Sequence, residues 1–328
     1  MEERPSTPAL QEFPQLSRLH FFSPQNQGVI ADYLAHLRAR HYAPTMQEGT
    51  IRALKSFAVL MPEARQAALY ADLTQTTPGD IDVWIETSFR HQLAPGTVAT
   101  RLRLMQGFFA FLGDQGYIAQ SPIRLPRHHI LVPQDLPRPM AEDEVSAFFR
   151  VIDALRDRTM FLLMLRCGLR VGEVSRLLWS ALDLAQGTVR IENSKGHVDR
   201  VVYLAPDVAK ALWQWHRLQA VEARYVFPSR LTRKGGMPLS ARQIRNRMTC
   251  YLKLAGITKA YSPHSLRHTF ATQLLNAGAA LEVVKELMGH RSLDVTLRYT
   301  QLYDRTKRAQ YDEAMAQVEK RHGFQQGR

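Results

Sequence analysis

Six residues in the second half of the chain have side chains suited to chemistry on a phosphodiester. They are two arginines, a lysine, two histidines and a tyrosine: Arg170, Lys195, His264, Arg267, His290 and Tyr299. Guanidinium groups can hold phosphate oxygens in bidentate fashion, and a phenol can act as a nucleophile. Each residue stands in a local context typical of a turn or a helix end, so we expect all six to be exposed. The set favours attack on a phosphodiester by a protein nucleophile, as in breaking and rejoining DNA, without a metal ion.

Arg170 lies in the segment 167–173 (CGLRVGE), where two glycines interrupt an apolar helix and a second helix begins. Glu173 follows Arg170 at the i,i+3 spacing, so a simple surface ion pair is an alternative explanation. Alone, this motif says little about function.

The segment 262–270 (SPHSLRHTF) is more informative. Pro263 suits the first position of a helix whose N-cap would be Ser262 or Tyr261. His264 and Arg267 would then be neighbours at a helix N-terminus, where free N–H groups and the helix dipole favour an anion. The opposite, core-facing stripe is predicted to hold Leu266, Phe270 and Leu274.

A zinc site is the alternative for this helix, because His264 and His268 have the i,i+4 spacing of some zinc-binding helices. The sequence lacks the intervening glutamate and a nearby third ligand, which disfavours zinc. Cys167 and Cys250 are the only cysteines, too few for a disulfide framework or a thiolate zinc site. Both are predicted to be small apolar fillers in helices, and no metal or other cofactor is expected.

The last candidates follow a helix that is predicted to end at Gly289, with His290 directly after it. Tyr299 comes nine positions later. With apolar residues at positions 293 and 297, an isolated tyrosine there would more often belong to the core. Tyr303 is a second candidate nucleophile, although its spacing from His290 is different.

The second half of the chain is predicted to be one domain, residues 140–328. Acidic residues from Glu142 suit a first helical turn, and an apolar helix through 160–165 stops near Gly168. Alternation over 188–192 and 200–204, with turn residues at 193–196, predicts a β-hairpin with Lys195 at or near its tip. Helices are expected from Pro206 to the end, including a terminal helix over 303–320.

The first half is predicted to be helical. Residues 1–25 form an N-terminal arm, 26–120 a helical domain, and 121–139, with five prolines, an extended linker at the domain boundary. Thr77-Pro78 and Ala94-Pro95 read as helix starts. Several basic residues lie off the apolar faces and could contact DNA or simply be solvated: Arg38, Arg40, Arg52, Lys55, Arg90, Arg101 and Arg103.

Bulk composition agrees with a polyanionic partner. The 328 residues carry a formal charge of +13, which favours nucleic acid and, second to it, an anionic membrane surface. We see neither an apolar run long enough to span a membrane nor a signal peptide, so a cytoplasmic location is expected.

CGLRVGE around Arg170, Lys195 on a hairpin, then HSLRH, GH and RYT occur in the order and spacing of the tyrosine recombinase (phage integrase) family. The chain resembles that family over the whole second domain, and an order of four helices, linker and catalytic domain fits the rest. The resemblance implies a mainly α fold with a small β-hairpin or sheet: an N-terminal helical core-binding (SAM-like) domain and a catalytic domain. The hairpin reads NSKGHVDR, so Lys195 is assigned from its Lys-Gly turn and the basic residue after it.

The resemblance implies a role for each residue. Tyr299 would attack the scissile phosphate, forming a 3′-phosphotyrosine and a free 5′-hydroxyl. Lys195 would protonate the departing 5′-oxygen, and His264 would accept the tyrosine proton or hold the phosphate.

The remaining residues would act on the phosphate oxygens. Arg170 and Arg267 would hold them, and His290 would donate a further hydrogen bond. Glu173 would orient Arg170 or His264. No metal or nucleotide is implied, because the phosphotyrosine keeps the bond energy.

Members of the family act as tetramers on two DNA sites and pass through a Holliday junction. A specific double-stranded core site with inverted repeats is therefore the expected partner, with an accessory DNA-binding protein as an option. Along the terminal helix, one face could dock on a neighbouring subunit or pack on its own domain: Tyr311, Met315 and Val318.

Two other functions stay open: a type IB topoisomerase that relaxes DNA, and an inactive DNA-binding protein. Within the family, integration, transposition, cointegrate resolution and chromosome-dimer resolution share this chemistry. The absence of an evident further DNA-binding domain favours a simple recombinase of the Xer or transposon-resolution type.

Overall fold

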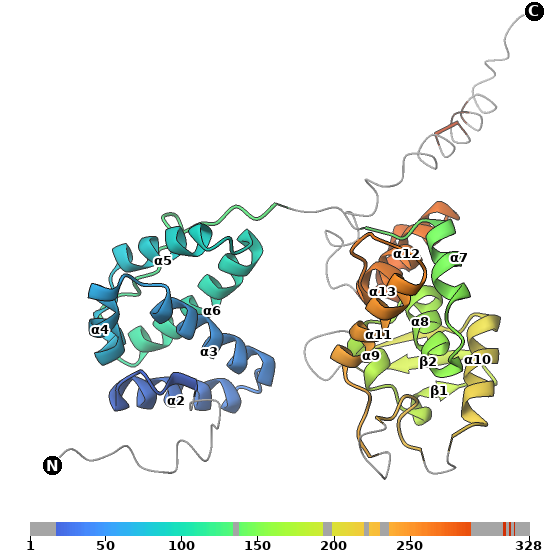
Figure 1. Cartoon of the computed structure of the whole chain (residues 1–328), viewed down its shortest axis with the longest axis horizontal. Helices are drawn as coiled ribbons and strands as arrows, with labels where there is room; N and C mark the ends of the chain where they lie inside the picture. The colour runs from blue at the N-terminus through green and yellow to red at the C-terminus, as the bar shows by residue number, and fades with distance from the viewer. Residues whose placement is uncertain are drawn as a thin grey trace, which may run out of the picture. The chain divides into compact units, whose positions relative to one another are not determined.

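The computed structural model describes residues 18–133, 138–192, 199–219, 223–229 and 236–289, together with 311, 312, 315 and 318. The chain divides into two compact units, residues 1–134 and 135–328, and each has its own hydrophobic core. The division falls within the segment expected to be a linker. Most of the described residues are helical and the strands form one small sheet, so the predicted fold class is confirmed (Figure 1).

Five α-helices form the described part of the first unit, where four were expected. They are α2 (Pro24–Ala39), α3 (Pro44–Val59), α4 (Glu63–Ala71), α5 (Pro78–Arg90) and α6 (Pro95–Asp114), with a 3-10 turn η2 (Leu73–Gln75) after α4. The unexpected helix is α4, a short helix of nine residues that buries only Leu69. The largest buried side chains of this core are aromatic: Phe57, Trp84, Phe108 and Phe109.

Both predicted proline starts are confirmed. Pro78 opens α5 after the N-cap Thr77, whose backbone N–H donates to Asp80 Oδ2 at 2.7 Å in a capping box. Pro95 opens α6 after Ala94. The basic residues set off the apolar faces are exposed, apart from Arg101, which is half-buried and donates to Ser56 Oγ at 2.7 Å.

The first part of the expected linker, residues 121–133, packs on the first unit. Ile123 joins the core of that unit, and His128 is buried with its Nδ1 accepting from the backbone N–H of Arg124 at 2.9 Å. Arg127 Nε donates to Asp82 Oδ2 on α5 at 2.9 Å. The prolines keep this stretch irregular, but its apolar and histidine side chains hold it against the helices.

The second unit surrounds the apolar helix α8 (Leu155–Cys167), which packs against α10 (Pro206–His216) and α12 (Pro263–Asn276) (Figure 1). A three-stranded antiparallel sheet has the order β1-β2-β3, and its two longer strands are those of the predicted hairpin. The remaining elements are α7 (Glu142–Arg150), α9 (Val171–Ser175), η3 (Trp179–Ala181), β1 (Leu182–Asp183), β2 (Thr188–Ile191), β3 (Arg200–Tyr203), α11 (Ala241–Leu254) and α13 (Leu281–Met288). Lys195 falls in 193–198, outside the described residues.

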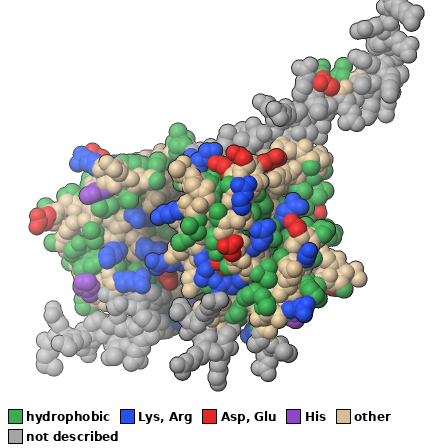
Figure 2. All heavy atoms as spheres, turned by 45° about the vertical axis from the view of Figure 1, so that its right-hand side comes forward, with side chains coloured by type: hydrophobic (Ala, Val, Ile, Leu, Met, Phe, Trp, Pro, Cys, Tyr) green, Lys and Arg blue, Asp and Glu red, His purple; other side chains and the backbone are tan. Residues whose placement is uncertain are grey.

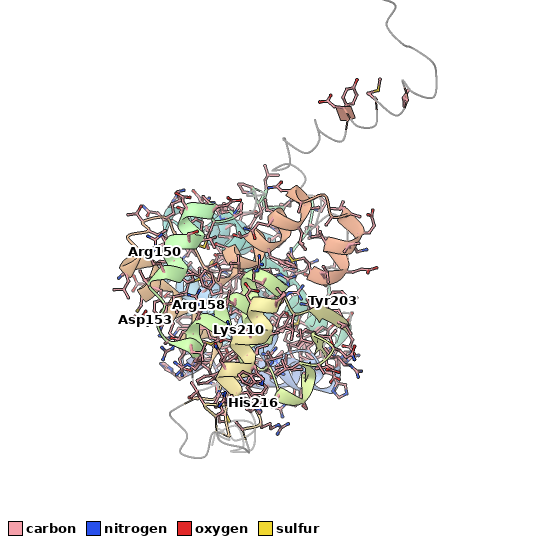
Figure 3. The ribbon with its side chains drawn as sticks, turned by 90° about the vertical axis from the view of Figure 1, so that its right-hand side faces the viewer. Arg150, Asp153, Arg158, Tyr203, Lys210 and His216 are labelled. Atoms are coloured by element: carbon pink, nitrogen blue, oxygen red, sulfur yellow. The ribbon has the colours of Figure 1, made fainter. Side chains whose placement is uncertain are left out.

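Strand β3 alternates between the inside and the surface of the second unit. Arg200 and Val202 are buried, whereas Val201 and Tyr203 are exposed. Figure 3 labels Tyr203, together with two exposed residues of α10, Lys210 and His216. An arginine therefore takes an inward position at the first residue of the strand, paired with Ile191 of β2.

The two cysteines differ in environment. Cys167, the last residue of α8, is buried as predicted, but Cys250 on α11 is exposed, so the prediction for it was wrong. The buried stripe of α11 is formed by Ile244, Met248 and Leu252, and Cys250 stands between two of them on another side of the helix. No helix within the described ranges is long and apolar enough to cross a membrane.

Helix α8 ends where predicted, at Gly168, whose φ of +66° lies in the left-handed region. A Cβ at this position would lie 2.5 Å from Cδ1 and Cε1 of Phe270 on α12. Gly168 thus allows both the end of α8 and the close approach of α12.

We predict that Gly168→Ala lowers the free energy of unfolding more than Gly256→Ala does. Gly256 has a similar φ of +69° but nothing within 4 Å of its Cβ position. Both variants carry the left-handed cost of about 1–2 kcal/mol, and only Gly168→Ala adds about 1–3 kcal/mol of overpacking. Urea unfolding of both variants measures the difference, and equal losses would contradict the close contact with Phe270.

Candidate active site

The centre of the site is the C-terminal end of α13, where three consecutive carbonyls accept hydrogen bonds from three arginines. The pairs are Arg200 Nε with Leu287 O at 2.8 Å, Arg267 Nη2 with Met288 O, and Arg170 Nη2 with Gly289 O at 3.0 Å. The last carbonyls of a helix lack intrahelical partners and lie at the negative end of its dipole. Arginines from β3, α12 and the start of α9 therefore fix this end in place.

Arg170 is held by Glu173 as well as by α13. Arg170 is the N-cap of α9, and its backbone N–H donates to Glu173 Oε2 at 2.7 Å. Its Nη1 donates to Glu173 Oε1 at 2.9 Å, while a quarter of its side chain stays exposed (25%). The structure thus brings Glu173 onto Arg170, one of the two partners proposed for it.

Arg200 is a further residue of the site, which the sequence analysis missed. Its Nη1 and Nη2 donate to the two carboxylate oxygens of Glu173, at 3.0 and 2.8 Å, and both side chains are 5% exposed. The alternation of residues 200–204 contained a signal, because it places a charged side chain at a position that faces the core.

These contacts set the charge state of Glu173. Burial would raise its pKa, but hydrogen bonds and charge from Arg200, and then from Arg170, outweigh burial and lower the pKa to about 2. The carboxylate is therefore ionised at any physiological pH, and it accompanies three arginine cations at the end of α13.

Arg267 lies on α12 as predicted, but it is buried (4% exposed), so the expectation that it would be exposed was wrong. Helix α12 packs on both α8 and α13, and these helices cover the face that carries Arg267. Its two Nη groups donate to Gly168 O, at the end of α8, and to Met288 O. Arg267 therefore joins the ends of two helices.

His264 stands one turn earlier on α12, after the N-cap Ser262 and Pro263, and is exposed. Desolvation of its ring and then the positive charges of Arg267, Arg245 and Arg170 lower its pKa below the ordinary 6.5. A neutral imidazole at neutral pH can accept a proton or a hydrogen bond. Desolvation, with charge from His264 and Arg267, lowers the pKa of His268 to about 4.

The structure thus brings Arg170, Glu173 and Arg267 together, and His264 is near enough to feel the charge of both arginines. Gly289 ends α13 with a φ of +59°, directly before His290 in the sequence. Four other candidates, Lys195, His290, Tyr299 and Tyr303, lie outside the described residues. Within the described ranges no three His, Cys, Asp or Glu side chains are placed to hold a metal ion.

Residues 138–306, more than half of the chain, match the model of the phage integrase family. The chain belongs to this family. It is 32% identical over 291 residues to the tyrosine recombinase XerD of Lacticaseibacillus casei, with 84% of this chain and 94% of that protein covered. It is 30% identical to the tyrosine recombinase XerC of Xylella fastidiosa (strain M23), with 84% and 92% covered.

The fold agrees with this assignment. A lambda integrase dimer bound to a COC′ core site superimposes with a TM-score of 0.66 at 16% identity, covering 83% of this chain and 94% of that one. The predicted family is confirmed, and the chain is a tyrosine recombinase, an enzyme of site-specific DNA recombination.

We predict that Glu173→Gln lowers the free energy of unfolding by about 3 kcal/mol at pH 7, because two arginines lose a buried charged partner. The folded pKa of about 2 lies below the ordinary 4.5, so this stabilisation is complete above pH 4.5 and is lost as the pH falls towards 2. The difference between wild type and variant, measured by urea unfolding, should therefore shrink in acid.

Glu192→Gln is the matched control. Glu192 pairs with Arg190 at 3.3 Å, and both side chains are about two-thirds exposed (68% and 66%). Its loss should cost at most about 1 kcal/mol. A Glu173→Gln effect as small as this control, or one that stays constant between pH 7 and 3, would contradict the buried pair.

Proposed function

We propose that this recombinase cleaves and rejoins DNA through Tyr299, by a 3′-phosphotyrosyl intermediate and a Holliday junction. The observation that carries the proposal is the arrangement of Arg170 and Arg267 at the end of α13. Two guanidiniums from distant parts of the sequence meet there, within reach of His264 by their charge, and Arg170 binds the carbonyl of Gly289, the residue that precedes His290 in the sequence. A phosphate bound there could accept hydrogen bonds from both guanidiniums, which would stabilise its negative charge.

In the forward step the Tyr299 oxygen attacks phosphorus and its proton passes to His264, whose lowered pKa keeps the imidazole neutral. The bond to the 5′-oxygen breaks, and Lys195 supplies the proton that this oxygen needs. Rejoining is the reverse, when a 5′-hydroxyl of the exchanged strand attacks the phosphotyrosine.

The other residues act on the developing charge. Arg170 and Arg267 would hold the non-bridging oxygens, with His290 donating a further hydrogen bond, and Glu173 would keep Arg170 in orientation. Since each intermediate retains the energy of the broken bond, the cycle itself requires no nucleotide.

Double-stranded DNA with an inverted-repeat core site is the proposed partner. The formal charge is +13, and Lys and Arg side chains are spread over the face shown in Figure 2. We propose that 26–120 is a core-binding domain, 121–139 a linker and 140–328 the catalytic domain, with the cytoplasm as the location. Residues 1–25 are proposed as an arm, of which Leu19 and Phe22 pack in the core of the first unit.

We also propose assembly into a tetramer on DNA, with or without an accessory protein. On the terminal segment, Tyr311, Met315 and Val318 are helical and exposed (60%, 37% and 44%), as an interface between subunits requires. The similarity to two Xer recombinases, over 84% of this chain, favours resolution of chromosome dimers, cointegrates or transposons over phage integration.

The test is to express wild type, Tyr299→Phe and Tyr303→Phe in cells, denature the lysate, and sequence DNA that remains covalently attached to each protein. We expect adducts at one repeated sequence from wild type and Tyr303→Phe. Tyr299→Phe should give none while retaining binding, because it loses only the nucleophilic hydroxyl.

Other outcomes discriminate between the alternatives. Adducts from Tyr299→Phe but not Tyr303→Phe would move the nucleophile to Tyr303. Adducts without sequence preference would identify a type IB topoisomerase. No adducts, together with a specific footprint on genomic fragments, would identify a binding protein.

A further inference from the structure

We propose that Arg200 is the positioning residue of this active site: it joins the three segments that carry Arg170, Lys195 and His290. The proposal rests on the function proposed above. It assigns to Arg200 no contact with DNA, but the task of holding the groups that make such contacts.

The first link runs through Glu173 to Arg170. Arg200 donates two hydrogen bonds to the Glu173 carboxylate, one to each oxygen. The same two oxygens also accept hydrogen bonds from the side chain and the backbone N–H of Arg170. Glu173 therefore cannot shift without moving both arginines. Because Arg200 is 5% exposed, water does not compete for these bonds.

The second link runs to the end of α13. Arg200 Nε donates to Leu287 O at 2.8 Å, so one planar guanidinium spans Glu173 and α13. A Cβ at Gly289 would lie 3.0 Å from both Cδ and Nη1 of Arg200. The glycine that precedes His290 thus permits a close approach to the Arg200 side chain.

The third link is through the chain itself. Arg200 is the first residue of β3 and pairs with Ile191, the last residue of β2. The loop between these two strands contains Lys195. By anchoring the base of the hairpin to Glu173 and α13, Arg200 fixes the point from which the loop departs.

Geometry explains why an arginine is needed. Five N–H donors in a rigid plane reach two carboxylate oxygens and a carbonyl together, whereas a lysine has its donors on one atom. Without Arg200, Glu173 would keep Arg170 as a partner but would lose its bidentate pair. Burial would then raise the pKa of Glu173 from about 2.

The test compares Arg200→Met with Arg190→Met on the DNA site recovered from the covalent adducts. Arg190 is on the neighbouring strand, but it is exposed and pairs only with Glu192 among the contacts described. We expect Arg200→Met to cleave DNA on the order of 100-fold more slowly, with DNA affinity unchanged. Misplaced catalytic groups lower the reaction rate more than they lower the affinity for DNA. Arg190→Met should cleave at the wild-type rate.

A pH profile separates positioning from general damage to the fold. Besides Arg170 and Arg200, three charged residues line the cavity beside Glu173: Arg176, Arg190 and Glu192. His264, the proposed proton acceptor, also titrates in acid and does so in every variant. In Arg200→Met the cleavage rate should fall as the pH is lowered, at a higher pH than in wild type, because Glu173 becomes protonated. The double variant Glu173→Gln/Arg200→Met should not show this additional decline, because it has no carboxylate at position 173 to protonate.

A second pair of variants keeps arginine at position 200 and changes a glycine instead. Gly289→Ala should slow cleavage because its methyl group displaces Arg200. Gly278→Ala has a φ of +91° at the end of α12 with nothing within 4 Å of its Cβ position, and should not slow it. Arg200→Lys should fall between wild type and Arg200→Met.

The proposal is overturned if Arg200→Met cleaves as fast as Arg190→Met, or if it cleaves slowly with the wild-type pH profile. If wild type itself forms no covalent adducts with DNA, the proposed function fails. Urea unfolding then still tests whether Arg200 stabilises the Glu173 carboxylate. The stability difference between wild type and Arg200→Met should then shrink as the pH falls below 4.5; a constant difference would overturn the link.

Discussion

The organisation of the catalytic unit depends on how the end of α13 is stabilised. A helix of eight residues has little stability of its own, and its last carbonyls have no partners within the helix. Here those carbonyls accept from three arginines that come from different elements. The hydrogen bonds that stabilise the end of this short helix also bring together the guanidiniums that could bind a phosphate.

This arrangement has an electrostatic consequence. Arg170 and Arg200 share the buried carboxylate of Glu173, and Arg267 is held at the same end of α13 by a carbonyl, so three cations among the described residues gather at one point. Desolvation of the ring, and then the positive charges of Arg267, Arg245 and Arg170, lower the pKa of His264. A phosphodiester entering the site would compensate the positive charge of the arginines. The interaction that binds the DNA would therefore also stabilise the charge that develops during the reaction.

Much of this could be predicted from the sequence, because the relevant signals were local. Proline after a cap residue located the starts of α5, α6 and α12, and alternation located both long strands. The spacing of the motifs predicted that Arg170 and Arg267 belong to one site. What the spacing could not give was their environment: Arg267 is buried because two helices cover it, and this depends on packing between distant segments.

The features that the sequence analysis missed or predicted wrongly also depend on packing between distant segments. Arg200 looked like one more basic residue at a hairpin, since only the fold brings Glu173 and α13 to it. Helix α4 is short and buries a single side chain, Leu69, and Cys250 stands outside the stripe that α11 buries. The segment 121–133 reads as extended because of its prolines, yet Ile123 and His128 pack on the first unit.

Hydrogen exchange along α13 tests the central claim most directly. If the arginines hold the carbonyls of Leu287, Met288 and Gly289, the amides of the last turn should exchange as slowly as those in the middle of α12, against which α13 packs. If the last turn of α13 instead exchanges at the rate of a frayed helix end while α12 stays protected, the arginines do not fix this end, and the account of the site is wrong.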